Sequence, residues 1–255
     1  MSTPLRQERA HGDAVVRLIL DRPKANVLDM EMVRALRGAI AGLRDDAGLK
    51  LVVFEGSGPH FSFGASVPEH LPGRVESMLP DFHQLFVELE ALGVPTAAAV
   101  RGQCLGGAAE LVLWAGRVVL HPGARIGVPE VTLGVFPPIA ALGLRWRVSG
   151  ARATEMVVTG DPLSAEAALA TGLADAIDDD PRAAVDRWYS AHLSGLSAVA
   201  VRFAWRAARA PMRRALAEDL PQLERLYLQE LMACHDPVEG LTAFVEKRTP
   251  TWSDR

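Results

Sequence analysis

The sequence predicts an α/β core followed by a helical C-terminal region. Before Pro138, short β-branched and apolar runs such as VVRLIL alternate with helical patterns, which is typical of an α/β core whose sheet is covered on its faces. Beyond Pro138 the chain is mostly helical in pattern, with turns near Gly150, Gly160 and Gly172. Of the 255 residues, 49% are hydrophobic and 23% are charged, enough apolar material for a substantial core.

The first predicted elements can be justified in chain order. Residues 14–20 form a strand that ends before Pro23, because proline has no amide hydrogen for a sheet. Asp29 is a plausible N-cap for a helix. The apolar residues of that helix recur at intervals of three and four: Met30, Val33, Leu36, Ile40 and Leu43. A second buried strand, LKLVVFEG, is predicted at 49–56.

The next segment, SGPHFSFGASVPEHLPG (57–73), is predicted to be a functional loop, because glycines and prolines interrupt a stretch rich in aromatic residues and histidines. A helix follows with Phe82, Leu85, Phe86 and Leu89 on one face. Further strands are predicted at 94–102, 117–122 and 124–131. We divide the chain into a core of residues 1–195 and a helical region of residues 196–255.

Charge, cysteine content and motifs exclude several classes of protein. The formal charge of −4 disfavours general binding to nucleic acid or anionic membrane. Cys104 and Cys234 suit neither a disulfide framework nor a zinc site, and His-Glu-x-x-His and Gly-x-Ser-x-Gly motifs are absent from the sequence. We expect a cytoplasmic protein with no membrane span, no metal and a small-molecule ligand.

The stretch RGQCLGGAAELVLWAG (101–116) places two glycines before a helix that carries one glutamate among apolar residues. Gly106 and Gly107 either let an oxyanion reach main-chain amides or only allow close packing of strand and helix. Burial would raise the pKa of Glu110 and suit proton transfer, although a buried glutamate can also serve by accepting hydrogen bonds. Glu130, in GVPEVTLG, is either a second catalytic carboxylate or a solvated loop acid.

These motifs together make the sequence resemble the crotonase superfamily of enoyl-CoA hydratases and isomerases. The matching stretches cover nearly the whole chain: LDRPKANVLD, FSFGAS, VRGQCLGGAAELVLWAG, GVPEVTLGVFPP, EMVVTGDPLSAEAALATGLAD and GLTAFVEKRTPTW. The resemblance implies a spiral of β-β-α units with a C-terminal helical region that drives trimerisation. It also implies a homotrimer or a dimer of trimers, with coenzyme A entering only as part of a thioester substrate and no separate cofactor.

The resemblance also implies roles for individual residues. The amides of Ala65 and Gly107 would form an oxyanion hole, while Glu110 and Glu130 would hold a catalytic water. Gly64 and Gly106 would let these amides approach the thioester oxygen, and the residues assigned to coenzyme A are Lys24, Ala25, Asn26, Ser66, Val67, Phe244 and Lys247. His70 and Phe136 are assigned to the substrate pocket, and His70 receives no acid-base role.

Retention of two glutamates favours a hydratase, since isomerases of this superfamily generally use one carboxylate. The sequence departs from ordinary short-chain hydratases at Ser66, Pro68 and Ala108. It also has PIAA after Phe136 and Pro137, where common hydratases have a glycine-rich turn. FGASVPEHLP and LGVFPP are more similar to the cyclohexa-1,5-diene-1-carbonyl-CoA hydratase branch. Side chains that either line space for a flat ring or pack in the core are His70, Phe82, Phe86 and Phe136.

Two alternatives to a hydratase remain open. An isomerase would move a double bond without adding water. A non-catalytic homologue would bind acyl-CoA or RNA, and the stretch VRFAWRAARAPMRR offers an arginine stripe that is either a phosphate-binding surface or an ordinary helix face. The stripe consists of Arg202, Arg206, Arg209, Arg213 and Arg214.

Overall fold

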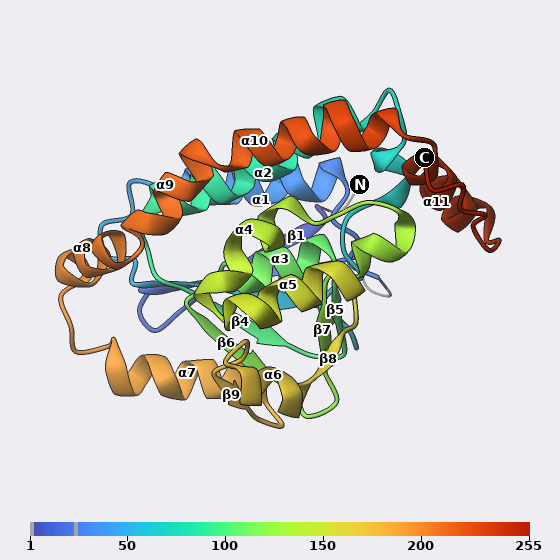
Figure 1. Ribbon diagram of the computed structural model, residues 1–255. Helices are drawn as coiled ribbons and strands as arrows, with labels where there is room; N and C mark the ends of the chain where they lie inside the picture. Colours follow the sequence, from blue (N-terminus) through green and yellow to red (C-terminus); the bar gives the residue numbers. More distant parts are fainter. Residues whose placement is uncertain (1–2, 23–24) are drawn as a thin grey trace.

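Two β-sheets organise the chain in the computed structural model, which describes residues 3–22 and 25–255 (Figure 1). The larger sheet has the order β1-β2-β3-β4-β6-β9, in which β1 and β2 are antiparallel and the other neighbours are parallel. Its strands are β1 (Leu5–Ala10), β2 (Val15–Leu20), β3 (Leu51–Gly56), β4 (Thr96–Val100), β6 (Arg117–Leu120) and β9 (Ala176–Ile177). The smaller sheet contains β5 (Gln103–Leu105), β7 (Arg125–Gly127) and β8 (Leu163–Ser164).

Successive units contribute one strand to each sheet and then a helix. After β4 the chain forms β5 and then α3 (Gly107–Leu113). After β6 it forms β7, the 3-10 helix η2 (Pro129–Leu133) and α4 (Pro138–Gly143). The segment after β3 also reaches the smaller sheet, because Ser62 forms a parallel bridge with Cys104. This arrangement is the predicted spiral of β-β-α units.

The remaining helices surround the sheets (Figure 1). The α-helices are α1 (Met30–Gly42), α2 (Val75–Leu92), α5 (Gly150–Thr159), α6 (Ala165–Thr171), α7 (Pro181–His192), α8 (Ala198–Ala208), α9 (Ala210–Glu218), α10 (Leu220–Arg225) and α11 (His235–Glu246). The short helical turns are η1 (Val67–His70), η3 (Leu144–Trp146), η4 (Leu226–Glu230, a π-helical turn) and η5 (Leu231–Ala233). As predicted, Asp29 caps α1, and its Oδ1 atom accepts a hydrogen bond from the Met32 amide at 2.9 Å.

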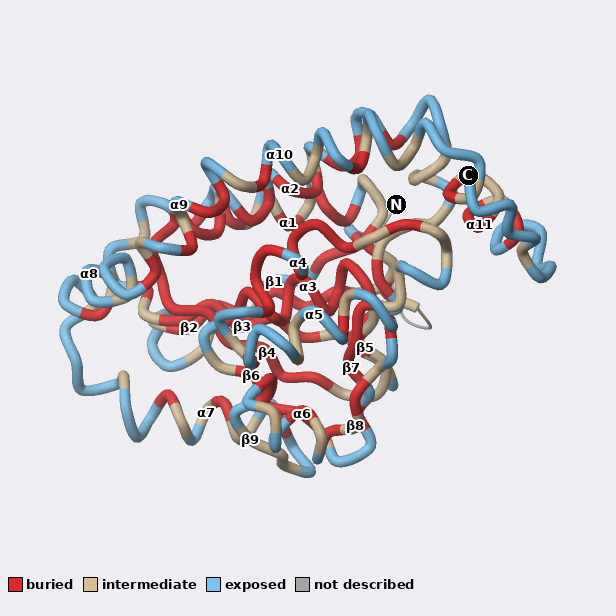
Figure 2. Tube along the Cα trace, viewed as in Figure 1, coloured by how far each residue is buried: buried red, intermediate tan, exposed pale blue. Residues whose placement is uncertain are grey.

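The larger sheet separates two apolar clusters because alternate strand residues point to opposite faces. Val15, Leu51, Ala97 and their partners pack against α7 on one face. The other face carries residues such as Leu18 and Phe54 into the main core, with α1, α2 and α3. The central strands β2, β3 and β4 are accordingly buried in Figure 2, whereas much of α8 is exposed.

A buried ionic cluster fastens the C-terminal helices to this core. The Arg209 Nε atom donates to Glu90 Oε1 at 2.6 Å, and the Trp114 indole donates to the same oxygen at 2.9 Å. Arg209 also donates to the Trp114 carbonyl at 2.8 Å. Further along, Met212, Leu216 and other residues of the helical region join the main core. The division of the chain after residue 195 stays a prediction.

The structure differs from the predicted elements in three places. The predicted strand at 124–131 ends at Gly127, and η2 follows because Pro129 cannot donate a ladder hydrogen bond but suits the start of a helical turn. The polar strand β1 was not predicted. The short strands β8 and β9 lie in a region that was predicted to be mostly helical. Within the described residues, no helix has both the length and the apolar character required to cross a membrane.

Candidate active site

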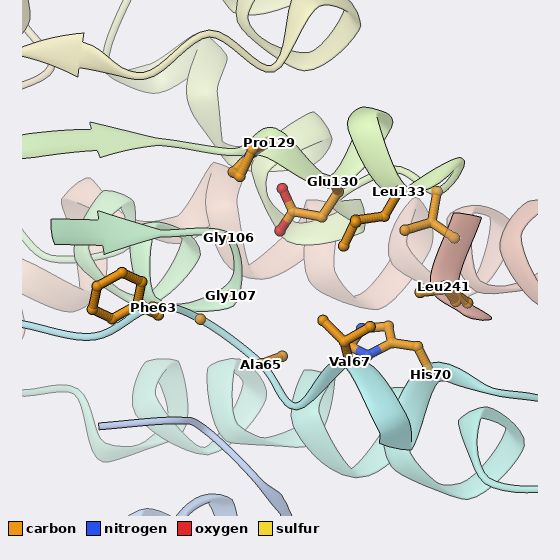
Figure 3. Close-up of a pocket in the computed structure, with 12 residues that line it drawn as sticks. Phe63, Ala65, Val67, His70, Gly106, Gly107, Pro129, Glu130, Leu133 and Leu241 are labelled. Carbon is orange, nitrogen blue, oxygen red and sulfur yellow. The ribbon is translucent and has the colours of Figure 1, made fainter. Parts of the chain in front are cut away.

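A cavity of about 70 Å³ lies where the segment after β3, the start of α3, η2 and α11 meet (Figure 3). We call it the outer cavity. Its lining residues are Phe63, Gly64, Ala65, Val67, His70, Gly106, Gly107, Pro129, Glu130, Leu133, Val135 and Leu241. A more enclosed inner cavity of about 20 Å³ shares Ala65, His70, Gly107 and Glu130 with it. The inner cavity is completed by Met78, Leu79, Phe82, Glu110, Phe136, Pro137, Pro138 and Tyr227.

The glycines bring two segments of main chain unusually close together. Gly64 has φ +99°, and a Cβ atom there would lie 2.6 Å from the Leu105 carbonyl oxygen and 3.4 Å from the Gly107 amide nitrogen. A Cβ atom at Gly107 would in turn lie 3.4 Å from the Ala65 amide nitrogen. Within the described residues, neither the Ala65 nor the Gly107 amide donates a hydrogen bond to a protein acceptor. Both amides therefore remain available beside the cavity that they line.

Glu110 lies one turn into α3, and only 3% of its surface is exposed. Its Oε1 atom accepts a hydrogen bond from the Ala140 amide at the start of α4, at 2.8 Å. Burial raises the pKa of Glu110 to about 7, although the hydrogen bonds from Ala140 and Ile139 lower it. Glu110 thus accepts a backbone hydrogen bond, which is one of the two alternatives considered from the sequence, and it also lines the inner cavity, where proton transfer stays a prediction.

Glu130 comes from η2 and points toward the glycine turn (Figure 3). A Cβ atom at Gly106 would lie 2.9 Å from Glu130 Oε1, so a glycine is required for this approach. Although the residue is half-buried as a whole, its Oε2 atom is buried and has no hydrogen-bond partner among the described residues. Burial, and then the charge of Glu110, raise the pKa of Glu130 well above its ordinary value. Glu130 is therefore not a solvated loop acid.

His70 lines both cavities from the end of η1. Its Nδ1 atom lies 2.9 Å from the Ser66 carbonyl oxygen, which requires a proton on Nδ1 and leaves Nε2 as the acceptor in the neutral ring. Burial lowers the pKa of His70, so the neutral form is favoured. This environment suits the predicted place in the substrate pocket.

The aromatic residues considered for the acyl pocket divide into two groups. Phe82 and Phe136 line the inner cavity. Phe86 does not, because its ring packs in the core between Phe82, at 5.3 Å, and Trp114, at 5.7 Å between ring centroids. Of the two alternatives left open for Phe86, the structure therefore favours core packing.

The residues predicted to contact coenzyme A lie in several environments. Lys24 lies outside the described residues, and Ala25 accepts a hydrogen bond from the Phe63 amide at 2.9 Å. The Asn26 side chain is buried, and its amide donates to three carbonyl groups of the segment 57–61. Asn26 therefore supports the loop rather than presenting its side chain to a ligand.

Of the other residues predicted to contact coenzyme A, some lie at the outer cavity and some lie away from both cavities. Val67 lines the outer cavity, and Ser66 precedes it as the N-cap of η1. Phe244, which is 55% exposed, and Lys247, at the end of α11, are not among the residues that line either cavity. Their predicted contacts with coenzyme A stay predictions.

Tyr227 and Leu241 line the cavities but were not identified from the sequence. Both come from the C-terminal helical region, where an apolar or aromatic residue at helical spacing indicates only burial. Two arginines of the stripe in the same region have structural contacts. Arg202 donates to the carbonyl groups of residues 46 and 92, and Arg209 belongs to the buried cluster with Glu90.

Comparisons with known proteins agree with this fold and geometry. Residues 10–255 match the family model described as enoyl-CoA hydratase/isomerase. The chain is 42% identical over 254 residues to the cyclohexa-1,5-dienecarbonyl-CoA hydratase of Thauera aromatica, with 100% of this chain and 98% of that protein covered. It is 32% identical over 245 residues to the 2,3-dehydroadipyl-CoA hydratase of Escherichia coli, with 94% and 96% covered.

A solved structure gives the same result. The enoyl-CoA hydratase from Mycobacterium avium subsp. paratuberculosis matches with a TM-score of 0.85 and 28% identity, and the match covers 98% of this chain and 99% of that one. Together with the glycine turn and the two glutamates that line the inner cavity, these matches confirm the resemblance inferred from the motifs. The chain therefore belongs to the enoyl-CoA hydratase/isomerase family and has its crotonase fold.

Proposed function

We propose that the protein is a hydratase that adds water to a conjugated enoyl-CoA or cyclic dienoyl-CoA thioester. The observation that carries this proposal is the pair of buried carboxylates, Glu110 and Glu130, around one small cavity beside two available amides. The inner cavity of about 20 Å³ suits a single water molecule, which needs roughly 10–15 Å³. Two carboxylates around one water can divide the roles of base and acid.

In the proposed reaction, the Ala65 and Gly107 amides hold the thioester oxygen and stabilise the enolate charge that develops on it. One glutamate accepts a proton from water while the water oxygen forms a bond with the β carbon. The other glutamate delivers a proton to a carbon of the conjugated system, so the elements of water are added in full. Burial raises the pKa of both carboxyl groups, and the charge of Glu110 raises that of Glu130 further, so the pair can hold one proton between them near neutral pH.

Two observations favour a cyclic dienoyl group. The Thauera aromatica relative is named a cyclohexa-1,5-dienecarbonyl-CoA hydratase, and Phe82 and Phe136 give the inner cavity aromatic walls. A six-membered ring needs more room than this cavity offers. The proposal therefore requires the half-buried Phe136 side chain to move as the acyl group enters.

The decisive experiment incubates the protein with linear enoyl-CoA and cyclic dienoyl-CoA thioesters in ¹⁸O-labelled water and measures product mass. A hydratase incorporates one labelled oxygen, and faster turnover of the cyclic dienoyl substrate identifies the acyl group. An isomerase would shift the double bond without taking up label. Binding of every thioester without turnover would favour a non-catalytic homologue.

The remaining features follow from the family resemblance. We propose that coenzyme A enters only as part of the substrate, that no separate cofactor is used, and that the protein acts in the cytoplasm. We also propose a homotrimer or a dimer of trimers. The largely exposed helix α8 supports assembly, because Val199 is 62% and Phe203 is 64% exposed on it (Figure 2). Light scattering on the purified protein measures the number of subunits.

A further inference from the structure

Tyr227 places a phenol group in the wall of the inner cavity, which it lines together with Gly107, a residue far away in the sequence. It lies in η4, the π-helical turn that follows α10, and only 1% of its surface is exposed. Glu110 and Glu130 line the same cavity, and the charges of both raise the pKa of Tyr227, after the larger effect of burial. The phenol therefore keeps its proton and can act as a hydrogen-bond donor.

The hydroxyl group of Tyr227 is buried and has no hydrogen-bond partner among the described residues. A buried hydroxyl without a partner destabilises a folded protein, whereas phenylalanine would fill the same space without this cost. The apolar part of the ring is already well packed, with the Phe136 ring 5.3 Å away between centroids. Packing alone therefore does not account for a tyrosine at this position.

The position of this phenol is fixed by neighbouring contacts. One turn earlier on the same helical stretch, Glu224 Oε1 accepts a hydrogen bond from His83 Nδ1 of α2 at 2.7 Å. This contact ties α10 to α2 immediately before η4. π-helical turns occur frequently at functional sites because they alter the direction of side chains within a helix. Tyr227 thus enters the cavity from a restrained segment.

We propose that Tyr227 donates a hydrogen bond to the oxygen atom that is added to the substrate. The inference rests on the proposed hydratase function and extends it to a third polar contact. A water molecule has two donor hydrogens, which can face Glu110 and Glu130, and two lone pairs. The phenol occupies one lone pair, and the other remains to form the bond with carbon. In the product, the same phenol contacts the new hydroxyl group.

The kinetic test compares Tyr227→Phe with Tyr189→Phe, the same change at the only other tyrosine of the chain. Tyr189 is a matched control because it is buried against the opposite face of the sheet, on α7. Tyr227→Phe should lower kcat for hydration about tenfold, the effect of one lost hydrogen bond, with little change in KM. Its Tm should equal or exceed that of the unmodified protein. Tyr189→Phe should leave kcat unchanged.

A second reaction separates water binding from effects on the glutamates. Exchange of the α-hydrogens of a saturated acyl-CoA with deuterated water needs the oxyanion hole and a carboxylate, but no water addition. Tyr227→Phe should retain this exchange while losing hydration. Equal loss of both reactions, no loss of either, or a lower Tm would each overturn the proposed contact.

A crystal structure of the unmodified protein tests the contact without any turnover. An ordered water within about 3.2 Å of the Tyr227 hydroxyl and of one glutamate is expected, and Tyr227→Phe should displace it. Failure to find such a water, in the presence of other ordered buried waters, would overturn the inference. If no thioester is hydrated, the proposed function fails, whereas the crystal structure still decides whether the Tyr227 hydroxyl binds a buried water.

Discussion

The Glu110 carboxylate accepts a hydrogen bond from the Ala140 amide at 2.8 Å, so the first turn of α4 orients an acid that belongs to α3. The Glu130 carboxylate is held differently, since its buried Oε2 atom has no partner among the described residues. The two acids of the inner cavity are therefore unequal before any ligand enters. Such a difference in surroundings is the usual way in which paired carboxylates acquire separate acid and base roles.

Replacing either acid by its amide should abolish most of the proposed hydration. Glu110→Gln and Glu130→Gln each remove a group that can transfer a proton, and we expect kcat to fall by about 10²- to 10⁴-fold. Glu155→Gln is the control, because Glu155 is an exposed residue of α5 paired with Arg152. Steady-state assays, with circular dichroism to check folding, measure the effect. Full activity of a folded Glu130→Gln protein would refute the paired-acid mechanism.

The raised pKa of Glu110 should make the protein less stable as pH rises. The pKa of this carboxyl group is 4.5 in the unfolded chain and about 7 in the folded protein. The group therefore stabilises the fold fully below about pH 4.5, and this contribution is lost as the pH rises through 7. The loss is on the order of 3 kcal/mol, at about 1.36 kcal/mol per pKa unit. Urea unfolding across this pH range should show that Glu110→Gln flattens the decline. A wild-type stability that increases over this range would contradict the burial of a protonated acid.

Adding one methyl group at the glycine turn should impair turnover selectively. A Cβ atom at Gly107 would lie 3.3 Å from the Ala65 Cβ and 3.4 Å from the Ala65 amide nitrogen, where the thioester oxygen is proposed to bind. Gly107→Ala should therefore lower kcat/KM by about 10²- to 10³-fold, as loss of an oxyanion donor does. In contrast, Gly38 of α1 has nothing within 4 Å of an added Cβ atom. Gly38→Ala should leave activity unchanged and stabilise the helix by roughly 0.5–1 kcal/mol.

Breaking the buried ionic cluster should loosen the C-terminal helices. Glu90→Ala leaves Arg209 buried and without its charged partner, which we expect to lower the free energy of unfolding by about 3–5 kcal/mol. The exposed pair of Arg152 and Glu155 is the comparison, and Glu155→Ala should cost less than about 1 kcal/mol. Chemical denaturation of both variants measures the difference. Equal, small effects would show that the buried cluster does not hold the helical region.

Local sequence patterns predicted one helix and part of the candidate site. Asp29 and the apolar spacing after it predict α1, and the apolar neighbours of Glu110 predict its burial. Adjacent glycines left open either an oxyanion site or close packing, and the family resemblance paired Gly107 with Ala65, which it approaches closely. The order of these motifs identified the family and its fold, which no single pattern among them could have done.

The missed features depend on contacts between distant segments. The strand β1 carries the polar run RQER at 6–9, as an edge strand can, and these residues do not show which strand it pairs with. Tyr227 meets Glu110 and Glu130 only through packing of the C-terminal helices on the core. At position 129, proline overrode the β-branched neighbours that had suggested a longer strand.

The Ala65 and Gly107 amides belong to successive units of the spiral, one after β3 and the other after β5. Neither unit alone holds the pair, so the spacing of these two nitrogens depends on how adjacent units stack. A slip between layers would change that spacing without altering any residue of the cavity. Chemical shifts of the two amides would therefore act as a gauge of layer stacking in the whole molecule.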